Sequence, residues 1–174
     1  MRAVVEKLEQ KVTVILLEGG AGRWCYEIEC VAYGRFRWLR GYGATRMRYE
    51  PSNFWWAPPI QKMEVEPARG GGYAVMAYFK PNAIKPGQRF RLHFAFDLNP
   101  TWNADELKFS ERLLNDAKVT QMRFLLPPGY ELEKSNRPPD RVVDAGSPLL
   151  IWDMTAPNTV YQFEFTIRRA GLIP

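Results

Sequence analysis

The sequence predicts an all-β protein, built as a single antiparallel β-sandwich of about eight strands. The clearest sign is Arg89–Leu98, where large apolar side chains alternate with polar or small ones, as in a strand with one buried face. Residues 160–168 repeat this pattern near the end of the chain. Because the apolar face of one such strand is buried only by a second layer, the two stretches indicate a sandwich. Among sandwiches we favour a jelly roll over an immunoglobulin-like fold.

The composition agrees with one globular domain. A chain of 174 residues can bury a sizeable core, and its 46% hydrophobic and 14% aromatic content excludes an intrinsically disordered protein. The 14 prolines and 13 glycines are spread along the chain and fit many turns between short strands. We therefore predict a single domain over residues 1–174.

The first half of the chain predicts short strands separated by glycine and proline. Residues 12–17 and 24–33 are expected to form a hairpin. An arginine-rich strand is expected at 35–40, and residues 51–59 are predicted to be a loop or a sheet edge because proline cannot join a central ladder. A further strand is expected at 73–79.

The second half of the chain adds the only helix that the sequence predicts, over residues 104–116. Asn103 followed by Glu106 imitates a helix capping box, and leucines then recur at helical spacing. Strand alternation returns at 119–126 and at 149–154. The helix is thus expected to be an insertion between strands.

Both cysteines lie on the predicted strand at 24–33. The five residue steps from Cys25 to Cys30 span about 16 Å when extended, whereas a disulfide needs Cα atoms within about 7 Å. The two residues also have opposite parity, which places Cys30 in the core and Cys25 at the surface. We expect two free thiols, with an intermolecular disulfide through Cys25 as the alternative.

The N-terminal residues do not predict export. The first ten residues carry charges where a secretory signal has its apolar region, so we expect no signal peptide and a cytosolic chain, unless a precursor has been trimmed. No stretch approaches the roughly 18 apolar residues of a membrane span.

The sequence contains no recognisable catalytic or cofactor set. His93 is the only histidine and stands on the polar face of its strand, so no metal site is expected. No nucleophile motif or phosphate-binding loop is present. Acids such as Glu27 and Asp97 alternate along predicted strands, as exposed acids commonly do, and a carboxylate pair for glycoside hydrolysis is a minor alternative. We predict a protein that is not an enzyme and needs no cofactor.

Two stretches are predicted to contact a partner. Between Gly34 and Tyr49 five arginines occur without an acid, and three consecutive aromatic residues follow in the proline-rich stretch. The candidate interface residues are Arg35, Arg37, Arg40, Arg46, Arg48, Phe54, Trp55 and Trp56. Nucleic acid is the less favoured partner, because charge also protects exposed strand edges from aggregation. A sugar-stacking platform at Trp55 and Trp56 is the alternative use of the aromatic residues.

From residue 119 onward the chain has a predicted strand, then Leu-Pro-Pro-Gly-Tyr, a loop, Leu-Ile-Trp-Asp-Met and Tyr-Gln-Phe-Glu-Phe-Thr-Ile. This order resembles the second half of immunoglobulin-like repeats in prokaryotic surface proteins. Lys-Pro-Gly-Gln at 85–88 fits the start of such a repeat. The resemblance covers residues 73–168 and implies sandwich architecture with a cell-surface or carbohydrate-binding role.

The whole chain is also similar, in size and class, to the single jelly-roll major capsid proteins of tailless, membrane-containing icosahedral phages. This resemblance implies a structural subunit that associates with its own copies and with a second coat protein through edge strands and loops. It also implies assembly in the host cytoplasm and a place in the virion. We rank this role first because the chain is longer than one immunoglobulin-like repeat and shows no export signal.

Overall fold

The computed structural model describes residues 3–144 and 146–171 of the chain. Within them the chain forms thirteen strands and a short 3₁₀ turn, η1 (Glu18–Gly20). The strands are β1 (Val4–Leu16), β2 (Gly22–Tyr33), β3 (Gly41–Met47), β4 (Ser52–Trp56), β5 (Ile60–Pro67), β6 (Tyr73–Phe79), β7 (Arg89–Leu98), β8 (Lys108–Asn115), β9 (Ala117–Leu125), β10 (Tyr130–Ser135), β11 (Arg141–Asp144), β12 (Pro148–Met154) and β13 (Thr159–Arg169).

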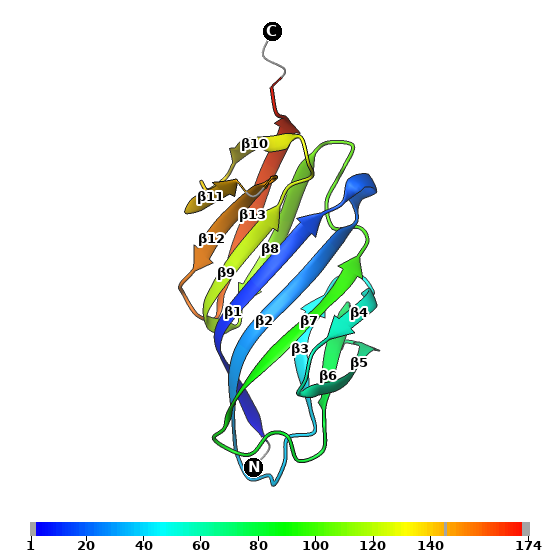
Figure 1. Cartoon of the computed structure of the whole chain (residues 1–174), viewed down its shortest axis with the longest axis vertical. Helices are drawn as coiled ribbons and strands as arrows, with labels where there is room; N and C mark the ends of the chain where they lie inside the picture. Colours follow the sequence, from blue (N-terminus) through cyan, green and yellow to red (C-terminus); the bar gives the residue numbers. More distant parts are fainter. Residues whose placement is uncertain (1–2, 145, 172–174) are drawn as a thin grey trace.

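The strands form one large sheet and two small ones. The large sheet has seven strands in the order β11-β12-β9-β1-β2-β7-β4, and the small sheets have the orders β10-β13-β8 and β3-β6-β5. Figure 1 shows both small sheets behind the large one, the first nearer the C-terminus and the second beside β7. The inner face of the large sheet is therefore covered by two separate pieces.

The all-β sandwich predicted from the sequence is confirmed, with more strands than the eight expected. Its strand order differs from that of a jelly roll, which distributes eight antiparallel strands over two sheets. Here β1 pairs with β9 in parallel, and the strands divide into sheets of seven, three and three. Strand alternation alone does not distinguish these arrangements, because it specifies which face is buried and leaves the neighbour of each strand open.

Several strands lie where the sequence predicts them. Strand β7 has the predicted bounds, and β1 and β2 form the predicted antiparallel hairpin. Cys30 is buried on the inner face and Cys25 is partly exposed, both as free thiols. Burial raises the pKa of the Cys30 thiol to about 12, so this thiol stays protonated at neutral pH.

The predicted helix at 104–116 is wrong, because residues 108–115 form strand β8, which pairs with β13. The capping signal itself is real, since Asn103 Oδ1 accepts hydrogen bonds from the N–H groups of Asp105 (3.1 Å) and Glu106 (3.0 Å). The chain then turns instead of continuing as a helix. Pairing and packing against β13 outweigh the helical preference of the leucine and charged residues in this stretch.

The predicted strand at 35–40 is also wrong. These residues form the loop between β2 and β3, and their arginines are exposed. In the described part of the chain, no helix is long and apolar enough to cross a membrane.

The core lies between the large sheet and the two small ones. Beneath β10-β13-β8, the buried Phe124 ring of β9 lies 4.7 Å from Phe109, 5.1 Å from Phe165 and 5.7 Å from Trp152. Beneath β3-β6-β5 a second aromatic group is buried, in which Tyr26 stacks on Phe94 at 4.9 Å and Phe79 lies 5.6 Å from Phe90. Tertiary burial thus stabilises each small sheet separately on the same large sheet.

Candidate ligand groove between the two small sheets

A groove of about 330 Å³ separates the two small sheets on the inner face of the large sheet. Strand β3 lines it on one side and β8 on the other. Each of them is the edge strand of its own sheet, since β3 pairs with β6 and β8 pairs with β13. The volume is in the range of small-molecule binding sites, roughly 300–1,000 Å³.

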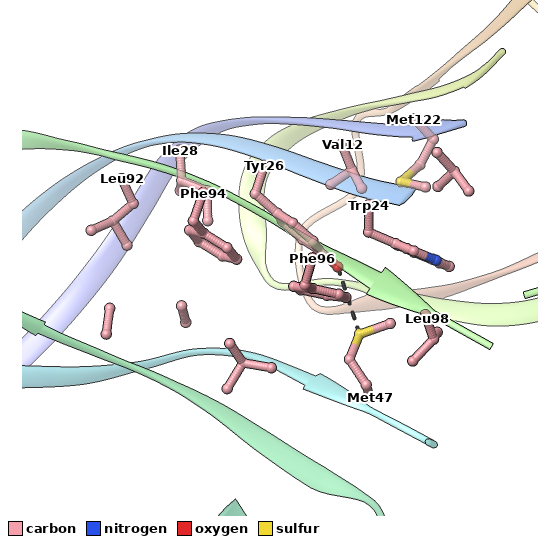
Figure 2. Close-up of a cluster of buried hydrophobic side chains, with 14 of the residues drawn as sticks. Val12, Trp24, Tyr26, Ile28, Met47, Leu92, Phe94, Phe96, Leu98 and Met122 are labelled. Carbon is pink, nitrogen blue, oxygen red and sulfur yellow. Dashed lines mark hydrogen bonds between the residues drawn. The ribbon is translucent and has the colours of Figure 1, made fainter. Parts of the chain in front are cut away.

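The floor of the groove is apolar and belongs to the large sheet. It consists of Val12 on β1, Trp24 and Tyr26 on β2, Leu98 on β7 and Met122 on β9. Figure 2 shows Val12, Trp24 and Met122 on the large sheet and Met47 on the opposite side of the layer, where its Sδ accepts a hydrogen bond from the Tyr26 hydroxyl (3.7 Å). Burial raises the pKa of Tyr26, so its hydroxyl remains a neutral donor.

Two β-bulges shape one end of the groove. The register of β1 against β2 shifts between Lys7 and Glu9, so that Lys7 and Gln10, three positions apart, are both buried. The register of β3 shifts beside Ala44, whose carbonyl oxygen accepts a hydrogen bond from Lys7 Nζ (2.6 Å). The buried ammonium of Lys7 thereby joins the large sheet to the edge of β3.

Lys7 also forms an ion pair with Asp116 at an Nζ–Oδ2 distance of 2.5 Å. The side chain of Lys7 is 2% exposed and that of Asp116 is 42% exposed, so solvent reaches the carboxylate only. Lys7 Nζ lies 5.9 Å from the centre of the Tyr42 ring, a further favourable contact for a cation. The geometry keeps the buried charge of Lys7 compensated from three sides.

A buried polar network continues from this ion pair along the groove. Asn115 accepts a hydrogen bond from the Thr120 hydroxyl (2.7 Å), and Gln10 Nε2 donates to Thr120 Oγ1 (3.2 Å) and to Asp116 Oδ1 (3.4 Å). Gln10 is 6% exposed, yet its Oε1 has no hydrogen-bond donor within residues 3–144 and 146–171. An unpaired buried acceptor costs about 1–3 kcal/mol, and this atom is shielded from solvent by its neighbours.

The rim of the groove carries arginines on both sides. Arg46 and Arg48 come from β3 and the residue after it, and Arg112 comes from β8. Arg46 donates to the carbonyl oxygens of Arg69 (3.0 Å) and Gly71. None of the three rim arginines forms a salt bridge with any described residue.

Glu111 faces into the groove from β8, in line with the inward-facing residues of that strand. Partial burial raises the pKa of the Glu111 carboxyl, and the positive charge of Arg48 opposes this shift. The groove therefore has an apolar floor, a polar end at Gln10 and a mainly basic rim.

The structure distributes the predicted interface residues over three places. Arg35, Arg37 and Arg40 lie in the exposed β2–β3 loop, whereas Arg46 and Arg48 line the groove. The three aromatic residues, Phe54, Trp55 and Trp56, lie on β4, an edge strand of the large sheet. The prediction of a loop or edge at this stretch is confirmed, but the eight residues do not form one continuous surface.

The two tryptophans of β4 point to opposite faces of the sheet, as neighbouring residues of a strand do. Trp55 is 47% exposed and lies 4.8 Å from the His93 ring on the outer face, while Trp56 is 37% exposed. Phe54 packs on the core ring of Phe96 at 5.6 Å. Trp55 and Trp56 therefore do not form one flat platform.

Sequence reasoning missed the polar end of the groove. Gln10 has the same parity as Val12, Val14 and Leu16, and a polar residue on an otherwise apolar face was an available signal. Lys7 offered no such signal, because only the bulge turns it inward. Within the described ranges, no three His, Cys, Asp or Glu side chains are grouped closely enough to hold a metal ion.

Comparison with known proteins yields a likeness of fold. No protein-family model matches the chain, and no curated protein matches its sequence. Among solved structures, the M1 zinc metallopeptidase from Deinococcus radiodurans is similar, with a TM-score of 0.53 and 10% sequence identity, and a point mutant of that enzyme gives the same values. The match covers 93% of this chain, and the chain spans 42% of the metallopeptidase.

The likeness does not extend to a zinc site. The His-Glu-x-x-His motif of zinc peptidases requires two histidines, and this sequence has one. The comparison therefore supports the arrangement of the sheets and does not assign an activity to this chain.

Proposed function

We propose that the chain is a binding module that holds an elongated, mainly apolar ligand in the groove between β3 and β8. The observation that carries the proposal is the combination of an apolar floor with a polar end at Gln10 and Asp116 and arginines at the rim. Binding sites commonly pair apolar walls with a few polar groups that orient the ligand. A ligand N–H or O–H at this end would reach the exposed carboxylate of Asp116, while the rest of the ligand would cover the floor at Trp24 and Met122.

Binding without catalysis agrees with the charges in the groove. Asp116 is held by Lys7, which leaves Glu111 as the only groove-lining carboxyl without a salt bridge in the described part of the chain. Glycoside hydrolysis requires two carboxyl groups with separate roles. The likeness to a metallopeptidase is one of fold, so the proposal depends on the groove.

The test uses anilinonaphthalene sulfonate, an apolar anionic dye whose fluorescence rises in apolar sites. Thr45 lines the groove from β3, and Thr45→Trp would fill it, whereas Thr166→Trp places the same bulk on the outer face of a small sheet. We expect Thr45→Trp to weaken dye binding at least tenfold and Thr166→Trp to leave it unchanged.

Leu113→Trp, which fills the groove from β8, repeats the test if Thr45→Trp does not fold. Near-ultraviolet circular dichroism of each variant checks that the dye reports on a folded protein. Equal binding by the wild type and a folded groove variant would refute the proposal.

A second candidate is the structural-subunit role, and a specific observation favours it. Both edges of the seven-stranded sheet carry exposed apolar side chains, Trp55 and Trp56 on β4 and Val142 and Val143 on β11. An open apolar edge is a template for pairing with another chain. Such edges suit assembly of identical subunits, whether in a coat or in another lattice.

Sedimentation velocity at rising protein concentration tests this second candidate. We expect dimers or larger species, and we expect the double variant Val142→Lys, Val143→Lys to shift them toward monomer. A protein that is monomeric at every concentration would contradict the assembly role without affecting the groove.

A further inference from the structure

We infer that the occupant of the groove is an extended segment of another protein, paired as a β-strand with β3 on one side and with β8 on the other. This inference rests on the proposed function of the groove and names the class of its ligand. The recognised segment is acidic and apolar in alternation.

The first argument comes from the backbone. Strand β3 uses one edge to pair with β6, and β8 uses one edge to pair with β13. Their other edges flank the groove, which is lined by Thr45 and Met47 on one side and by residues 111–114 on the other. Unpaired strand edges offer N–H and C=O groups to an added strand, the mode of recognition known as β-augmentation.

The second argument comes from the arrangement of the layers. The two small sheets cover the same face of the large sheet (Figure 1), and the edge strand of each one lines the groove. One inserted strand would join β10-β13-β8 to β3-β6-β5 as one continuous sheet. That sheet would face the large sheet as the second complete layer of a sandwich, with every edge at the groove satisfied.

The third argument fixes the side chains of the occupant. Alternate residues of an inserted strand would point to the floor formed by Val12, Trp24 and Met122, which requires apolar side chains. The residue nearest Asp116 would carry a donor, such as a serine or threonine hydroxyl, because this groove-lining carboxylate is 42% exposed. The remaining residues would point outward between Arg48 and Arg112.

The basic rim selects the charge of these outward residues. Arg48 and Arg112 have no salt-bridge partner among the described residues, and Asp116 is neutralised by Lys7. Aspartate or glutamate on the occupant would supply partners on both sides of the groove. Basic outward residues would meet like charge.

The experiment begins with a random eight-residue peptide library displayed on phage and selected on the full chain. Enriched peptides are synthesised, and their affinities are measured by isothermal titration calorimetry. We expect acidic and apolar residues in alternation and at least tenfold weaker binding to Thr45→Trp, with Thr166→Trp as the control. Arg48→Glu and Arg112→Glu should each weaken binding at least tenfold, whereas Arg91→Glu on the outer face should not.

Backbone pairing is then tested by single N-methylation along one peptide. Successive N–H groups of a strand point to opposite edges, so pairing with both β3 and β8 makes central residues of either parity sensitive. We expect at least a tenfold loss at each central position. Sensitivity at one parity alone, or at neither, would overturn the inference of an inserted strand.

Two other results would also overturn it. If no peptide is enriched while the dye still binds the groove, the occupant is a small apolar molecule and the proposed binding function survives. If the chain dimerises and Thr45→Trp abolishes the dimer, the occupant is a second copy of the chain. If the wild-type chain binds neither the dye nor any peptide, the proposed binding function itself is refuted.

Discussion

Two parts of the inner face of the large sheet have different neighbours. Beneath β10-β13-β8, Phe124 on β9 is enclosed by three aromatic rings at 4.7–5.7 Å. Two residues earlier on the same strand and the same face, Met122 lines the groove. Both side chains are buried, Met122 at 3% exposure and Phe124 at 0%, so the difference lies in their neighbours: aromatic rings surround Phe124, whereas the groove borders Met122.

The contrast has a simple physical basis. Each small sheet is wide enough to cover its own part of the large sheet, and neither supplies a strand for the strip between them. The floor side chains are only 3–5% exposed, but on the side of the groove they contact fewer protein atoms than side chains of the enclosed core and so gain less dispersion energy. Paired substitutions on β9 measure this difference directly.

The largest effect is expected for Phe124→Ala. Removal of an enclosed ring leaves a cavity that its neighbours cannot fill, and such changes cost about 3–5 kcal/mol of unfolding free energy. Met122→Ala should cost about 2 kcal/mol, since its loss widens an existing groove and removes mainly the transfer free energy of the side chain. Urea unfolding of the two variants checks the difference, and equal costs would show that the groove is closed in solution.

The next largest effect concerns the buried ion pair at the end of the groove. Asp116→Asn leaves the ammonium of Lys7 buried without its counter-ion, and such a loss costs about 3–5 kcal/mol. Lys7→Met should cost about 1–3 kcal/mol, because the exposed side of Asp116 can be solvated and the main penalty is the unpaired carbonyl of Ala44.

Thermal unfolding of the two variants at neutral pH tests this asymmetry. The opposite ranking, with Lys7→Met the more harmful change, would mean that Lys7 acts mainly by holding β3 in place. Loss of dye binding in folded Lys7→Met, with Met122→Ala as the comparison, would support the same conclusion.

Much of the covered region was predictable from the sequence. The strands β7 and β13 alternate so regularly that their inner faces follow from parity alone, and the cysteine parity placed Cys30 in the core. The helix prediction was wrong because the sequence of β8 is amphipathic at helical spacing as well as at strand spacing, and pairing with β13 selects the strand. Local pattern thus identified the inner faces but not the neighbours of each strand.

The groove could not be predicted in the same way. It depends on which strands end each small sheet, and that is a property of long-range pairing between residues far apart in the chain. Arg46 and Arg48 were singled out from composition and do line the groove, yet their loop neighbours Arg35 and Arg37 lie elsewhere. Lys7 points inward only because of a β-bulge, and no residue pattern in the sequence predicted this bulge.

The smallest predicted effect is on the pH dependence of stability and involves Glu111. Burial raises the pKa of its carboxyl in the folded protein above the ordinary value of 4.5, with Arg48 opposing the shift. The folded state therefore binds more protons than the unfolded state in the range just above pH 4.5, and this contribution to stability is lost as pH rises through the folded pKa. Glu111→Gln should make the urea midpoint fall less between pH 4.5 and pH 7 than in the wild type.

Glu9→Gln, which removes an exposed carboxyl from the outer face, corrects for the general loss of one negative charge. Identical pH profiles for the two variants would show that Glu111 is fully solvated and that the groove is wider in solution. A ligand that covers the groove would bury Glu111 further and raise its pKa again. Groove binding should then strengthen as pH falls toward the pKa of Glu111, and this trend should disappear in Glu111→Gln but persist in Glu9→Gln.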